Sequence, residues 1–140
     1  MHQTLRHSSD QSFDFVYDSI LDLQKFGELH PNMTEVKVID KTAAYTEYRI
    51  KERIKIWGFI PMRPEYTAKV FEIEKRKLIR YTSLVNGKVP LVNEFLFEQK
   101  DTHSPVEITE TIQLSGNKMI ASVLMGLMKK THTAIFQKLK

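Results

Sequence analysis

The apolar residues of this chain change their spacing twice along the sequence, and this change limits the folds that the chain can adopt. Between Phe13 and Leu21 they recur at helical spacing, from about residue 36 to residue 114 they mostly alternate with polar residues, and from Ile120 to Leu139 they return to helical spacing. Alternation predicts strands with one dry and one wet face, whereas helical spacing predicts amphipathic helices. The sequence therefore predicts an α+β protein whose sheet-forming region lies between helices.

Turn and cap signals set the expected order of elements before the sheet. A short strand at 3–6 precedes a helix that we place after Ser8-Ser9-Asp10-Gln11, because a Ser followed three residues later by Gln can cap a helix. A second short helix at 23–29 ends at His30-Pro31, since proline disfavours a helical conformation in the residue before it.

The chain after Pro31 predicts a sheet and one long helix. Strands are expected near 36–38, 48–56, 65–74, 78–85, 91–98 and 106–114. Short connections imply antiparallel neighbours, and the stretch from Trp57 to Pro64, with its Gly and two prolines, predicts an apolar loop. Ser115-Gly116-Asn117 offers capping chemistry for the last helix, which is the only element large enough to cover the dry face of the sheet.

Length and composition indicate one domain over residues 1–140. The chain has 140 residues, 41% hydrophobic, and no cysteine, so disulfides, thiolate ligands and cysteine nucleophiles are excluded. We expect a soluble cytoplasmic protein, because no apolar stretch approaches the roughly 20 residues of a membrane-spanning helix and the start lacks a signal-peptide pattern.

The charge balance is modestly basic, at +4 from 21 Lys/Arg and 17 Asp/Glu. Residues 117–140 contain lysines and no acidic residue. Such a surface can attract phosphate or anionic lipid, but the interrupted runs and the lack of an aromatic nucleic-acid motif favour a solvated lysine face. We therefore expect no nucleic-acid partner and no integral membrane association.

The order of elements resembles the helix-grip superfamily, that is, the START-like or SRPBCC proteins. The resemblance covers nearly the whole chain and is carried by the stretch from Ser9 to Tyr17, by Asp22-Leu23-Gln24-Lys25-Phe26-Gly27-Glu28-Leu29-His30-Pro31, by the strand succession and by the last helix. Within the superfamily it is similar to the polyketide cyclase/dehydrase-like and coenzyme-Q-binding branch. The resemblance implies a seven-stranded sheet curled around the C-terminal helix, with a mostly apolar pocket that binds lipids, polyketides, quinones or other ring systems.

Three polar residues lie at positions where the alternation predicts a dry face. Glu52 shares a strand face with Ile50 and Ile54, Glu110 lies between Ile108 and Ile112, and Asn93 lies between Leu91 and Phe95. A buried carboxylate must find a partner, reach water or take up a proton. Our hypothesis is that these groups orient a ligand in the pocket. The alternative is a bulge or sheet edge that returns them to water, or an internal pair with a base such as Arg80.

Aromatic and thioether side chains supply candidate pocket walls. Methionine adapts to irregular shapes, although any core needs such residues and each one taken alone fits a core position better. The Pro-bounded loop makes Trp57 and Phe59 the better candidates for a pocket mouth. The full set of candidate wall residues is Tyr48, Trp57, Phe59, Tyr66, Tyr81, Phe95, Met125 and Met128.

The histidines and short motifs do not predict a cofactor or a metal. The five histidines show no HExxH spacing and no Cys/His array, and the chain has no GxSxG, Walker or GxGxxG motif. His30 borders the pocket in the resembling family, but a surface histidine beside proline is the interpretation that we favour.

Ligand binding without catalysis is therefore the expected function, with two alternatives. A cofactor-free cyclase or dehydratase would use Glu52 and Glu110 as a general acid/base pair, if they face one cavity and repel each other. A peripheral lipid-binding module would lay the basic last helix on an anionic membrane. The protein would be a monomer, or a homodimer through apolar surface near Val123 and Phe136.

Overall fold

The computed structural model describes residues 1–56, 58–85, 87 and 89–140, and within these ranges the chain forms nine strands and three helices. In chain order they are β1 (His2–Ser9), α1 (Phe13–Leu21), α2 (Leu23–Leu29), β2 (Met33–Lys41), β3 (Thr46–Glu52), β4 (Ile54–Ile56), β5 (Ile60–Met62), β6 (Glu65–Glu74), β7 (Leu78–Val85), β8 (Val89–Glu98), β9 (Val106–Leu114) and α3 (Lys118–Lys138).

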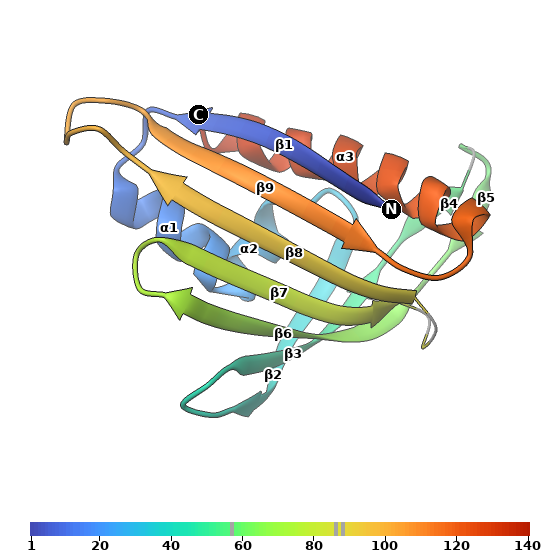
Figure 1. Ribbon diagram of the computed structural model, residues 1–140. Coiled ribbons are helices and arrows are strands. Elements are labelled where there is room, and N and C mark those ends of the chain that lie inside the picture. Colours follow the sequence, from blue (N-terminus) through green and yellow to red (C-terminus); the bar gives the residue numbers. More distant parts are fainter. Residues whose placement is uncertain (57, 86, 88) are drawn as a thin grey trace.

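Seven strands form one antiparallel sheet in the order β1-β9-β8-β7-β6-β3-β2, while β4 and β5 form a separate two-stranded hairpin (Figure 1). Strands β6 to β9 pair with their sequence neighbours, as short connections require. The first strand of the chain pairs with the last, so that Leu5 lies opposite Glu110. The predicted fold class is confirmed.

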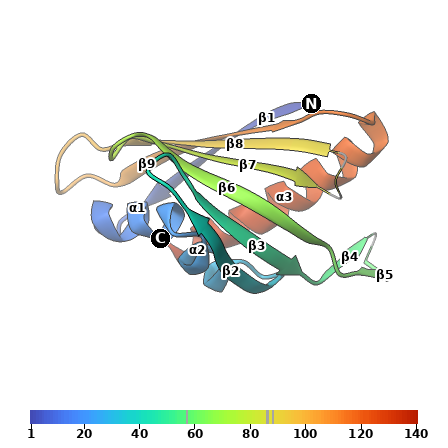
Figure 2. The ribbon, with the colours of Figure 1, turned by 90° about the horizontal axis from the view of Figure 1, so that it is seen from below.

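The long helix α3 crosses the concave face of the sheet, and α1 and α2 cover one end of that face (Figures 1 and 2). Seen from below, the sheet bends around α3 (Figure 2). One core cluster joins α1, α2, the sheet and the C-terminal part of α3, and includes Phe95 and Ile135. A smaller cluster joins the N-terminal part of α3 to β8 and β9 through Met125 and Ile112. The helix is therefore anchored to the sheet at both of its ends.

The helix ends follow local capping chemistry. Ser12, rather than Ser8 or Ser9, caps α1, with its Oγ accepting a hydrogen bond from the backbone N–H of Phe15. Asn117 caps α3 as expected, through bonds from Met119 and Ile120. The helix α2 ends at His30, before Pro31, as expected.

The expected strand over 48–56 is interrupted at Arg53, which was not predicted. The backbone N–H of Arg53 donates to the carbonyl of Asn32 at 2.8 Å, and that of Glu52 donates to Pro64 at 3.0 Å. The chain then leaves the sheet, so that 54–56, which we expected to continue the strand, form β4, and β5 forms within the stretch where we expected a loop. The bond to Asn32 also holds the segment that follows α2 beside the end of β3, which is the local origin of the site described next.

Candidate functional site

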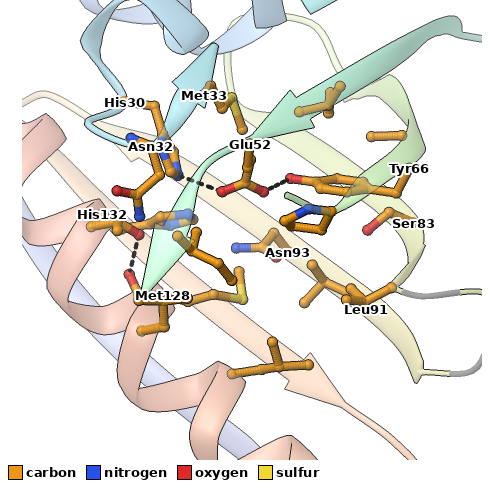
Figure 3. A pocket seen from close by; sticks show the side chains of 18 of the residues that line it. His30, Asn32, Met33, Glu52, Tyr66, Ser83, Leu91, Asn93, Met128 and His132 are labelled. Carbon is orange, nitrogen blue, oxygen red and sulfur yellow. Dashed lines mark hydrogen bonds and ion pairs between the residues drawn. The ribbon is translucent and has the colours of Figure 1, made fainter. Parts of the chain in front are cut away.

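A cavity of about 390 Å³ lies between α3 and the concave face of the sheet. This volume is in the range of roughly 300–1,000 Å³ that small-molecule sites occupy. Apolar side chains make up most of its wall, among them Phe26, Ile50, Ile54, Ala68, Leu91, Leu114, Leu124, Leu127 and Met128. Its polar side chains include His30, Asn32, Glu52, Tyr66, Tyr81, Ser83, Asn93, Thr131 and His132. Figure 3 shows His30, Asn32, Glu52 and His132 beside one another, with Ser83 apart from them.

The cavity reaches the surface beside the start of α3. Met119 and Ile120 line it and are 73% and 45% exposed. Ile56 of β4 and Met62 of β5 also line it, and the hairpin that carries them projects near the same end of α3 (Figure 1). The opening is therefore apolar and lies between the β4–β5 hairpin and the first turn of α3.

Glu110 of β9 lies fully buried behind the cavity wall, where it accepts hydrogen bonds from three side chains. One carboxylate oxygen, Oε1, is 3.0 Å from Nε2 of His7 on β1. The other, Oε2, is bonded by Nδ2 of Asn93 on β8, at 2.8 Å, and by Nδ1 of His132 on α3. His7 and Asn93 lie diagonally across the sheet from Glu110, where side chains on one face can meet. Glu110 therefore joins three sheet strands to α3.

The ionisation of Glu110 follows from these partners. Burial alone opposes the charged form, but the adjacent His132 and His7 favour it more strongly and lower the pKa of Glu110 from 4.5 to about 2. Glu110 is thus a carboxylate that accepts hydrogen bonds, so His132 donates its Nδ1–H to it. Stacking against Phe95 and an edge contact with Phe26 also hold the His132 ring.

Glu52 forms a second polar group, which faces the cavity directly. The hydroxyl of Tyr66 donates to Oε2 of Glu52, and Nε2 of His30 lies 3.9 Å from Oε1 (Figure 3). Burial raises the pKa of Glu52 above 4.5, despite the hydrogen bond from Tyr66. The pKa values of the two carboxyl groups are therefore shifted in opposite directions, and by different causes. Repulsion between Glu52 and Glu110 is not a cause of either shift.

His30 is buried and neutral, in contrast to the surface position that we favoured. It is 8% exposed, and burial, with the neighbouring His132 and Lys138, lowers its pKa from 6.5 to about 3. The backbone N–H of Asn32 donates to its Nδ1 at 3.1 Å. Because Nδ1 accepts this bond, the ring proton is on Nε2, which faces the Glu52 carboxyl group.

The candidate site residues differ in where they lie relative to the cavity. Glu52, Asn93, Tyr66, Tyr81 and Met128 line the cavity, and Glu110 lies one layer behind Asn93 and His132.

Other candidates lie away from the cavity wall. Tyr48, Phe95 and Met125 are buried in the core, and Phe59 is 72% exposed near the tip of the β4–β5 hairpin. Trp57 lies outside the described residues. The alternative partner of the acids, Arg80, is instead bonded to Glu94 through Nε and Nη2.

Sequence reasoning missed His7 and His132, although each lies on a pattern that could have identified it. His132 is four residues after Met128 and four before Phe136, on the apolar stripe of α3. A histidine on a buried stripe opposite a predicted buried glutamate is a candidate partner for it. Phe136, considered above as surface apolar area, is buried and stacks on His7 with ring centroids 3.7 Å apart.

Across residues 1–56, 58–85, 87 and 89–140, no group of three or more His, Cys, Asp or Glu side chains is arranged to hold a metal ion. No helix in that part of the chain has the length and apolarity needed to cross a bilayer.

The architecture is that of the helix-grip fold, in which an antiparallel sheet curls around a long C-terminal helix. Solved structures with this fold include the Zhui aromatase/cyclase from Streptomyces sp. R1128, which matches with a TM-score of 0.71 and 12% sequence identity, over 99% of this chain and 93% of that one. TTHA0849 from Thermus thermophilus matches with a TM-score of 0.72 and 13% identity, over 99% and 94%. A START superfamily protein from Mycobacterium smegmatis matches with a TM-score of 0.67 and 9% identity, over 99% and 95%.

At these identities the likeness concerns the fold and not the activity. No family model matches the chain, and no curated protein matches it.

Proposed function

We propose that the protein binds a small hydrophobic or ring-containing molecule, such as a lipid, polyketide or quinone, in the cavity between the sheet and α3. The observation that carries the proposal is a mostly apolar cavity of about 390 Å³ in which His30 lies beside both Glu52 and His132. Apolar walls favour an apolar ligand body, and a small group of neighbouring polar side chains fixes its orientation. The fold shared with START-like proteins and with an aromatase/cyclase supports the same class of ligand.

The alternative in which Glu52 and Glu110 act as a paired acid and base is less well supported. Glu110 does not line the cavity, and its two oxygens already accept bonds from His7, Asn93 and His132. A ligand would meet Asn93 and His132 before Glu110. Binding is therefore the function that the arrangement supports best, and a membrane-surface role is an outcome that the experiment below can reveal.

The test combines detection of a copurified ligand with a binding assay. Native mass spectrometry of the purified chain should show a noncovalent small molecule, and thermal unfolding should shift upward on addition of 2-naphthol or decanoic acid. A substitution that fills the cavity, Ser83→Trp, should abolish both signals. Its matched control, Leu84→Trp, places the same side chain at the next residue of β7, which is 49% exposed and does not line the cavity.

The proposal fails if no apolar or ring compound shifts the transition, or if Ser83→Trp and Leu84→Trp bind equally well. Cosedimentation with vesicles containing phosphatidylserine that is lost at high salt, with no cavity ligand, would instead favour the peripheral membrane role.

A further inference from the structure

The cavity wall contains two histidines whose free nitrogens have opposite hydrogen-bonding roles. His132 donates its Nδ1–H to the Glu110 carboxylate, so in its neutral form Nε2 carries a lone pair. His30 accepts at Nδ1 from the backbone of Asn32, so its Nε2 carries the proton. The two rings lie 6.3 Å apart between centroids, at 82° to each other. One histidine therefore offers a proton acceptor, and the other offers a hydrogen-bond donor.

Both nitrogens are available to a bound molecule. Nε2 of His132 makes no hydrogen bond within the described part of the chain. Because every fully buried side-chain nitrogen or oxygen there has a hydrogen-bond partner, this atom cannot be fully buried. Since His132 lines the cavity, Nε2 is in contact with the cavity space. Nε2 of His30 is 3.9 Å from Glu52, too far for a direct hydrogen bond, and His30 also lines the cavity. A ligand oxygen can therefore accept a hydrogen bond from Nε2–H of His30.

The buried Glu110 explains why His132 is held in this form. A buried carboxylate is tolerated only where hydrogen bonds compensate its lost hydration, and His7, Asn93 and His132 supply them. A base whose second ring nitrogen is bonded to a carboxylate has a fixed tautomer and orientation. Glu110 thus acts on the cavity through His132, as a positioning residue, without touching a ligand itself.

We propose that this cavity catalyses enolisation of a ring-bearing ketone, with His132 as the general base and His30 as the hydrogen-bond donor to the carbonyl oxygen. The inference rests on the proposed function, because the ketone must first bind in the cavity.

The step balances without a cofactor or a co-reactant. Nε2 of His132 takes a proton from the carbon next to the carbonyl, and the C–H electron pair forms the carbon–carbon double bond of the enolate. The carbonyl π electrons move to oxygen, which Nε2–H of His30 stabilises. Return of the proton from the imidazolium, to the same carbon or to another carbon of the conjugated system, regenerates the base. The outcome is exchange or isomerisation, with no net oxidation.

The experiment follows hydrogen–deuterium exchange in 2-tetralone, a bicyclic enolisable ketone, with the full chain. Proton NMR in D₂O should show that the protein exchanges the C1 protons at least tenfold faster than the same concentration of free imidazole. His132→Gln should lower the rate by about 100-fold while chemical-shift perturbation still shows 2-tetralone binding. His103→Gln is the matched control, because His103 is exposed in the loop between β8 and β9. This variant should exchange the 2-tetralone protons at the wild-type rate.

The role of Glu110 has its own readout. In ¹⁵N NMR of the wild-type protein at pH 8, His132 should show a protonated Nδ1 and an unprotonated Nε2. Glu110→Gln should change this pattern. Glu107→Gln, on the exposed face of the same strand, should leave it unchanged. If Glu110→Gln fails to fold, the wild-type spectrum alone decides, since a protonated Nε2 at pH 8 contradicts the assignment.

The catalytic inference and the binding proposal can fail separately. Bound 2-tetralone with exchange no faster than imidazole, or with the rate unchanged in His132→Gln, overturns the enolisation while binding stands. The inference is also overturned if other ring compounds bind and 2-tetralone does not. If no compound binds at all, the proposed function fails together with it.

Discussion

Glu110 shows how a single charged residue can be placed in the centre of this fold. It is the only carboxylate among the described residues with no exposed surface, and its charge is compensated by donors from β1, β8 and α3. Such a group does not have to add net stability, since a well-packed apolar residue can do as well. Its removal, however, leaves several buried donors without an acceptor.

We therefore expect Glu110→Ala to lower the free energy of unfolding by about 3–5 kcal/mol. The loss comes from the unpaired Asn93 amide and His7 and His132 rings, together with a small cavity. Glu107→Ala, at an exposed position of the same strand, should change the stability by less than about 1 kcal/mol. Urea titrations of both variants measure the difference, and equal losses would contradict the role of the buried bonds.

The alternation of residues placed Glu110 on the inner face of its strand, but no local pattern could predict its partners. His7 and His132 are 103 and 22 residues away in sequence, and they meet Glu110 only because the first strand pairs with the last and α3 folds back over both. The same limit applies to Glu52. The strand face on which Glu52 lies was predictable. Its neighbour His30, however, is held beside it by the hydrogen bond between Asn32 and Arg53, which the local sequence does not encode.

At the scale of elements, the helices and the seven sheet strands were predictable because each has a periodic apolar pattern of sufficient length. The β4–β5 hairpin was not, because its strands have only three residues each and β5 contains a proline. The packing of α2 on β2 also depends on a detail that periodicity does not reveal. A Cβ at Gly27 would lie 2.5 Å from Cγ2 of Val36.

We expect Gly27→Ala to destabilise the protein by about 1–3 kcal/mol, as overpacking does. Alanine improves helix propensity by about 1 kcal/mol, but Val36 has a stiff β-branched side chain that cannot move aside freely, so β2 would have to shift. The double variant Gly27→Ala/Val36→Ala should recover most of the loss relative to Val36→Ala alone. Chemical denaturation of the four proteins in this cycle measures the coupling, and additive losses would mean that the contact is not responsible.

At the scale of the whole molecule, the buried titratable groups connect the cavity to acid stability. The folded pKa of His30 is about 3 against 6.5 unperturbed, and that of Glu110 is about 2 against 4.5. At a pH between the folded and the unperturbed pKa of either group, the unfolded chain binds a proton at that group and the folded chain does not. Acid therefore favours unfolding. For His30 the loss begins as the pH falls below 6.5, and for Glu110 below 4.5. Glu52, whose pKa is raised, acts in the opposite direction and partly offsets them.

Below pH 6.5 and above the range where carboxylates titrate, His30 should therefore make the unfolding free energy fall by up to about 1.4 kcal/mol per pH unit, the value for one proton. His30→Gln removes this group. The unfolding free energy of the variant should therefore change less with pH between about pH 6 and pH 5, whatever the stability of the variant at pH 7. His103→Gln removes an exposed histidine and should leave the slope unchanged. Urea unfolding at half-unit pH intervals measures all three slopes, and a wild-type slope in His30→Gln would mean that His30 takes up its proton in the folded protein, which would remove the neutral donor from the cavity.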